Sequence, residues 1–239
     1  MLLEVCVDTI EGVWNAVRGG AGRIELCSAL SEGGLTPSGG LMSAAADLPV
    51  PVYVMIRPRA GFFHFSEEEE KIMARDIEMA LSLGLAGVVL GAQRHDGSLD
   101  RDMLERLSSK ATGMGRTLHR VIDTVPDPIA DLEVAIGLGF ERVLTSGAEL
   151  AAEQGLPLIR KLVEAASGRI SIMPGSGVTP ENAGKIIQAT GVRELHTSCS
   201  VVVADSDEEL SFAPAGGLKQ TSEQRVKEMV QAMNKVQKS

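Results

Sequence analysis

The chain of 239 residues is 44% hydrophobic and 23% charged, which is ordinary for a globular protein and long enough for one large domain with a substantial core. Its net charge of −9 argues against binding to nucleic acids or to anionic membranes, since both select for basic patches. No stretch approaches the roughly 20 consecutive apolar residues of a transmembrane helix.

Eight short strand-like runs recur along the chain, and helical signals separate them. The strands are expected at residues 3–8, 23–27, 52–57, 87–91, 117–121, 142–146, 169–173 and 193–198. A loop is expected over residues 200–220 and a last helix, capped by Thr221, over residues 221–236.

Three of the helix starts have clear capping signals. Ser66 and Glu69 form a capping box that opens a helix ending near Gly84. Asp127 and Thr179 each precede a proline, which is the usual order of a capping side chain followed by the first helical residue.

Strands that alternate with helices of this length predict parallel βαβ units. Eight such units match the ~250 residues of a (β/α)8 barrel. An open doubly wound sheet would favour a glycine-rich turn after the first strand, whereas Asp8-Thr9-Ile10-Glu11 follows it here. We therefore predict an α/β protein with a single (β/α)8 barrel over residues 1–239.

Several strands carry apolar residues on one face and polar residues on the other. In the first strand, Val5 and Val7 alternate with Glu4, Cys6 and Asp8. Successive side chains point to opposite faces of a strand, and burying ionisable groups without partners costs several kcal/mol each. The polar faces are therefore expected to converge on a functional site.

Seven sequence motifs stand out along the chain: EVCVD from residue 4, RIELCS from 23, GGLTPS from 33, MIRPR from 55, HR from 119, LTSG from 144 and MPG from 173. Together they resemble the motifs of one known family, the CutC family, which is named for copper homeostasis. The resemblance implies a (β/α)8 barrel, a cytoplasmic location, a homo-oligomer (dimer or tetramer) and binding of copper(I). No enzyme activity is implied by it.

The cysteines fit both the predicted compartment and the metal. The chain has three of them and its first residues lack the basic start of a signal peptide, so reduced thiols in the cytoplasm are expected. Cys6 and Cys27 each stand two residues after a glutamate, near the end of neighbouring strands. Thiolates are the soft ligands that copper(I) prefers, so both are candidate metal ligands. The alternative is that both are small buried hydrophobic residues.

Acid–base residues cluster at the same strand ends. The candidate catalytic residues are Glu25, His119, Asp123 and His196. Crowded carboxylates raise one another's pKa, and Asp123 is placed to orient His119 as a base. The alternative is a neutralised structural network of carboxylates and arginines.

A glycine loop after the seventh strand predicts an anion site. Gly175, Ser176 and Gly177 precede the expected helix start at Thr179, where such barrels often bind phosphate. Ser146 and Gly147 are expected to add N–H donors, and Arg57 and Arg59 positive charge. Glycines that simply permit a tight turn are the alternative.

Two functions stay open at this point, beside a purely structural oligomer. One is a cytosolic copper(I)-binding protein that uses Cys6 and Cys27. The other is a barrel enzyme that acts on a small anionic substrate, of which a phosphorylated metabolite is one example.

Overall fold

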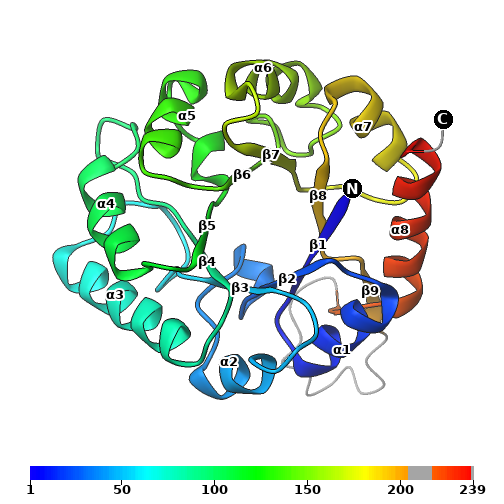
Figure 1. Ribbon diagram of the computed structural model, residues 1–239, viewed down its shortest axis with the longest axis horizontal. Coiled ribbons are helices and arrows are strands. Elements are labelled where there is room, and N and C mark those ends of the chain that lie inside the picture. Colours follow the sequence, from blue (N-terminus) through cyan, green and yellow to red (C-terminus); the bar gives the residue numbers. More distant parts are fainter. Residues whose placement is uncertain (204–216, 238–239) are drawn as a thin grey trace.

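Eight parallel strands form a single sheet that curls into a nearly closed barrel (Figure 1). The computed structural model describes residues 1–203 and 217–237. The sheet order is β7-β6-β5-β4-β3-β2-β1-β8, so the first strand pairs with both the second and the eighth. The (β/α)8 prediction is confirmed. The strands are β1 Leu2–Val7, β2 Arg23–Leu26, β3 Val52–Met55, β4 Gly87–Leu90, β5 Gly115–Leu118, β6 Arg142–Thr145, β7 Ser171–Pro174 and β8 Glu194–Thr197.

Helices surround the barrel on its outer face (Figure 1). The Ser66–Glu69 capping box is confirmed at the start of α3, and Asp127 caps α5 as predicted. Within the described residues, no helix is long and apolar enough to cross a membrane. The helices are α1 Ile10–Gly19, α2 Gly39–Ala45, α3 Glu67–Ser82, α4 Arg101–Lys110, α5 Pro128–Gly137, α6 Leu156–Ala166, α7 Ala183–Thr190 and α8 Glu223–Gln237, with short 3-10 turns η1 Leu30–Glu32 and η2 Arg120–Asp123.

The predicted helix start at Thr179 is wrong by several residues, because α7 begins at Ala183. The backbone N–H of Thr179 donates to the side-chain oxygen of Asn182 at 2.9 Å. This bond closes a turn over residues 179–182, and the turn separates the glycine loop from the helix.

The segment expected as a loop over residues 200–220 begins and ends with a strand. β9 (Ser200–Val203) pairs antiparallel with β10 (Leu218–Thr221), while residues 204–216 lie outside the described part of the chain. Thr221 belongs to β10 and so does not cap the last helix. Ser222 takes that place, since its hydroxyl accepts from the Arg225 N–H at 3.4 Å.

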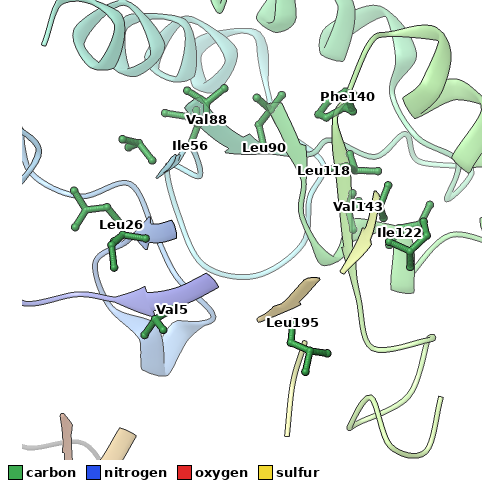
Figure 2. Close-up of a cluster of buried hydrophobic side chains, with 14 of the residues drawn as sticks. Val5, Leu26, Ile56, Val88, Leu90, Leu118, Ile122, Phe140, Val143 and Leu195 are labelled. Atoms are coloured by element: carbon green, nitrogen blue, oxygen red, sulfur yellow. The ribbon is translucent and has the colours of Figure 1, made fainter. Parts of the chain in front are cut away.

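The hydrophobic core lies between the barrel and its helices. Strand residues of outward parity, such as Val5, Val88 and Leu195, are fully buried there (Figure 2). Burying each such side chain stabilises the fold by about 1.5–3 kcal/mol. This layer leaves the inward-facing residues of the strands free for chemistry.

The amino-terminal end of the barrel interior is filled by one aromatic ring between two arginines. The guanidinium carbons of Arg23 and Arg142 lie 5.4 Å and 4.8 Å from the centre of the Tyr53 ring. Arg23 also forms a buried ion pair with Glu4 and a partly buried one with Glu194. Much of the charge expected inside the barrel is therefore a structural network at this end.

Candidate functional site

A cavity of about 840 Å³ opens at the carboxyl ends of the strands. This is the end of a (β/α)8 barrel that carries the active site in characterised enzymes. Its walls come from β1, β2, β8 and the segments that follow β3, β5 and β7. Among the predicted site residues, the lining includes Cys6, Glu25, Arg57, His119, Ser176, Gly177 and His196.

Three neighbouring strands bring a thiol, a carboxylate and an imidazole to one point of this cavity. Cys6 lies on β1, Glu25 on β2 and His196 on β8, and the register pairs Cys6 with Glu25. Their ligand atoms all lie within 4.8 Å of one another. The imidazole Nε2 of His196 lies 2.9 Å from Oε2 of Glu25. These three ligand atoms are close enough together to hold one metal ion.

Burial and charge determine the protonation of this cluster. Burial raises the pKa of the Cys6 thiol, which keeps the thiol protonated at neutral pH. Burial opposes protonation of His196, but the adjoining carboxylate of Glu25 outweighs it and raises the pKa of His196. The cluster therefore combines a neutral thiol with a paired imidazole and carboxylate.

Two buried carboxylate oxygens in and beside the cluster have no hydrogen-bond partner among the described residues. They are Oε1 of Glu4 and Oε1 of Glu25. The Glu4 atom lies 3.8 Å from Nε2 of His196. Buried polar atoms are nearly always satisfied in proteins, so these oxygens fit a site that holds a cation.

Cys27 lies outside this cluster and is covered by the glycine loop that follows β2. It is fully buried and packs with Tyr53, Met55 and Val89. A Cβ atom on Gly34 would stand 3.2 Å from its Sγ. The Sγ of Cys27 lies 3.7 Å from Oε2 of Glu25, so the carboxylate that contacts His196 also contacts this thiol. Burial and Glu25 raise the pKa of Cys27 well above its usual value.

Cys199 is a cavity residue that the sequence analysis did not select. It follows β8, lines the cavity and adopts a φ of +46°, which is unusual for a residue other than glycine. Burial raises the pKa of its thiol to about 11. The available signal was its position at a strand end, the same criterion that selected Cys27.

The structure gives His119 and Asp123 separate partners. The Nδ1 atom of His119 accepts from the Val121 N–H at 3.1 Å. The carboxylate of Asp123 instead accepts from the N–H groups of Ser146 and Ala148 and pairs with Arg120 at 2.8 Å. Asp123 therefore does not orient the imidazole of His119, contrary to the expectation from the sequence.

The loop after β6 binds a carboxylate from within the chain, that of Asp123. Asp123 takes the Ser146 N–H, and the Gly147 N–H donates to the hydroxyl of Thr145 at 2.8 Å. The donors expected here for an external anion are thus occupied within the chain.

The glycine loop after β7 keeps its place on the cavity wall. Ser176 and Gly177 have φ values of +72° and +65°, and both line the cavity. The Gly175 N–H donates to the Thr145 carbonyl, and the Ser176 hydroxyl donates to the Leu150 carbonyl. One backbone N–H and the serine hydroxyl of this loop therefore bind the chain itself.

The two candidate arginines differ in position. The guanidinium of Arg57 lines the cavity and donates to three backbone carbonyls. Arg59 is not among the lining residues; it pairs with Glu69 and donates to the carbonyls of Phe62 and His64.

The fold and this cluster define a (β/α)8-barrel protein with a thiol–imidazole–carboxylate centre at the active end of the barrel. The CutC family model matches residues 1–201, and the chain belongs to the CutC family. The resemblance found in the sequence motifs is confirmed.

Relatives from distant organisms share most of the chain. A CutC family protein of Sinorhizobium medicae (strain WSM419) is 58% identical over 200 residues, which cover 84% of this chain and 82% of that protein. The human copper homeostasis protein cutC homolog is 48% identical over 198 residues, covering 82% of this chain and 72% of the human protein.

Solved structures agree on the architecture. The putative copper homeostasis protein CutC from Streptococcus agalactiae superposes with a TM-score of 0.80 at 33% identity, covering 83% of this chain and 98% of that structure. A thiamine phosphate pyrophosphorylase from Pyrococcus furiosus reaches a TM-score of 0.61 at 16% identity, over 98% of this chain and 96% of that structure. The second likeness concerns the fold alone.

Proposed function

We propose that this protein acts in copper homeostasis by binding copper(I) at the floor of the barrel cavity. The observation that carries the proposal is the convergence of Cys6, Glu25 and His196 within 4.8 Å. Cys6 supplies the first sulfur ligand and His196 a nitrogen ligand, both of which suit copper(I). The names of the human and Streptococcus agalactiae relatives point to the same process.

Cys27 is the second sulfur ligand in this proposal. Its thiol reaches the carboxylate of Glu25, which contacts His196 in turn. Binding requires each thiol to lose its proton, and metal binding supplies the free energy for that loss. The negative charge of Glu25 and Glu4 then favours a bound cation.

The location and assembly proposed for the protein follow from its family and composition. We place it in the cytoplasm, where the three free cysteines stay reduced, and expect a homo-oligomer, either dimer or tetramer.

A competition titration of copper(I) against a chromogenic chelator, under strict reduction, tests the metal site. Wild type should bind one tight equivalent, and the Cys6→Ser/Cys27→Ser double variant should lose it. Cys199→Ser is the matched control and should keep the equivalent, because the two proposed sulfur ligands are Cys6 and Cys27, which flank Glu25. Tight binding that survives in the double variant would overturn the copper(I) site.

A second candidate function is an enzyme of the barrel type that acts on a small anionic substrate. The cavity at the catalytic end of the barrel favours it, with Arg57 and Ser176 on its wall. Glu25, His119, Asp123 and His196 are the acid–base candidates. Small phosphorylated or carboxylated metabolites should then protect the protein against thermal unfolding, and Arg57→Ala or Ser176→Pro should remove the protection.

A further inference from the structure

Arg57 is a buried cation without a carboxylate partner. Its relative exposure is 6%, and its guanidinium donates only to the backbone carbonyls of Glu32, Gly34 and Gly61. Within residues 1–203 and 217–237, Arg57 forms no salt bridge, although the carboxylate of Glu32 lies near enough to favour its charge. A buried charge that lacks a counter-ion is strongly destabilising, so this side chain is suited to an anion from outside the chain.

Two residues that line the cavity each carry a buried N–H group with no acceptor in the described part of the chain. One is Nε of Arg57 and the other is Nε2 of His119. Because Nδ1 of His119 accepts from the Val121 N–H, the ring proton sits on Nε2. Burial lowers the pKa of His119 to about 3, with Arg57 contributing, so the imidazole is a neutral donor at physiological pH.

A single phenylalanine joins the two donors. The Phe63 ring lies 4.6 Å from the His119 ring, centre to centre, and 5.1 Å from the guanidinium carbon of Arg57. All three residues line the cavity. On the far side, the absence of a side chain on Gly91 makes room for the imidazole, since a Cβ there would stand 2.5 Å from Cε1 of His119. Arg57 and His119 are thus both packed against the apolar ring of Phe63.

We propose that Arg57 and His119 bind the carboxylate of a small organic acid, whose carbon chain packs against Phe63. Two N–H donors match the two oxygens of a carboxylate, and one negative charge balances the one unpaired guanidinium. Asp123 shows the same chemistry within the chain, where a carboxylate binds the loop after β6. This inference specifies the ligand of the second candidate function and rests on it; it is independent of copper.

Thermal unfolding of the metal-free, chelator-treated protein tests the proposal. Sodium propionate should raise the melting temperature above the value in sodium chloride of equal ionic strength, and acetate should do so by less because it has a shorter chain. His119→Phe keeps a ring against Phe63 but removes the donor, and should weaken propionate binding about 10-fold or more, as expected for loss of a charge-assisted hydrogen bond. Arg59→Lys is the matched control and should bind propionate like wild type.

A second measurement needs no substitution of Arg57, which would disturb the loops whose carbonyls its guanidinium binds. In the wild-type protein, the Nε2–H signal of His119 in a proton–nitrogen NMR spectrum should shift on addition of propionate. A Cys6→Ser/Cys27→Ser protein should show the same shift, which separates this site from the metal site.

The remaining outcomes overturn the proposal. Stabilisation by inorganic phosphate without any by propionate would reject the carboxylate and leave the anionic-substrate function standing. The absence of stabilisation by either anion would reject both. Propionate binding that is unchanged in His119→Phe would show that the donor pair does not form the site.

Discussion

Nε2 of His196 and Oε2 of Glu25 lie 2.9 Å apart, although their strands are the last and the second of the barrel. The only strand between them is β1, which carries Cys6 to the same point. Three adjacent strands thus deliver three different ligand types to one end of the barrel. Closure of the sheet between β8 and β1 creates the cluster, since residues 25 and 196 are otherwise far apart in the sequence.

Glu25→Gln should weaken copper(I) binding about 10-fold to 100-fold, the range found when a group that orients a metal ligand is removed. The change keeps the shape of the side chain but removes the charge that pairs with His196 and faces both thiols. Competition with a copper(I) chelator measures the affinity. Glu141→Gln, at a side chain that is half exposed near the other end of the barrel, should leave the affinity unchanged. Equal affinities in the two variants would contradict the role of Glu25.

The positions of Cys6, Glu25 and His196 inside the barrel could be predicted from strand parity alone. A period of two fixes which face each residue occupies once the strand is recognised, and all three line the cavity. The partners of Cys27 and Asp123 could not be predicted in this way. They depend on the path of loops, namely the Gly34 segment that covers one and the loop after β6 that binds the other.

The boundaries of helices and strands were likewise predictable where local sequence determines them and not where a tertiary contact does. The capping box at Ser66 uses only local chemistry, so the start of α3 was predictable. The start of α7 was not, because Asn182 closes a turn that replaces the first helical turn expected after Thr179. The β9–β10 pair was also missed, since an antiparallel contact between residues 200 and 221 has no counterpart in the βα repeat.

The buried imidazole of His119 should make stability depend on pH in a defined window. Its pKa is lowered from 6.5 to about 3 by burial, so the unfolded chain binds a proton that the folded chain does not. The contribution of His119 is therefore complete above pH 6.5 and declines as the pH falls toward 3, by up to about 1.4 kcal/mol per pH unit.

Urea unfolding at a series of pH values measures this contribution. The difference between wild type and His119→Phe isolates it, because the other titrating groups are common to both proteins. The slope of the wild type should be steeper below neutral pH. Parallel pH profiles for the two proteins would show that His119 is protonated as readily in the folded state as in the unfolded one.

Arg23→Met should destabilise the protein by about 3–5 kcal/mol, because it leaves the carboxylate of Glu4 buried without its cation and Glu194 paired with Arg142 alone. Methionine fills a similar volume, so the loss reports charge rather than packing. Arg160→Met removes an ion pair to Glu164 in which both side chains are about two-thirds exposed, and it should change stability by less than about 0.5 kcal/mol. The free energy of unfolding in urea compares the two, and losses of equal size would contradict a structural role for the Arg23 network.

Gly155→Ala should destabilise the fold by about 2 kcal/mol, since the backbone after β6 passes directly against the start of α6. A Cβ on Gly155 would stand 2.8 Å from Cα of Gly147 and would also press on the carbonyl oxygen of Ser146. Both contacts are backbone atoms, so neither can rotate away. Gly137→Ala in α5 is the matched control because its Cβ would meet no atom within 4 Å. Alanine there should be neutral or stabilising by up to about 1 kcal/mol.

The urea concentrations at the midpoint of unfolding, measured at one pH, rank the two variants. A Gly155→Ala protein as stable as wild type would mean that the loop after β6, and with it the Asp123 contacts at the cavity mouth, can move away from α6.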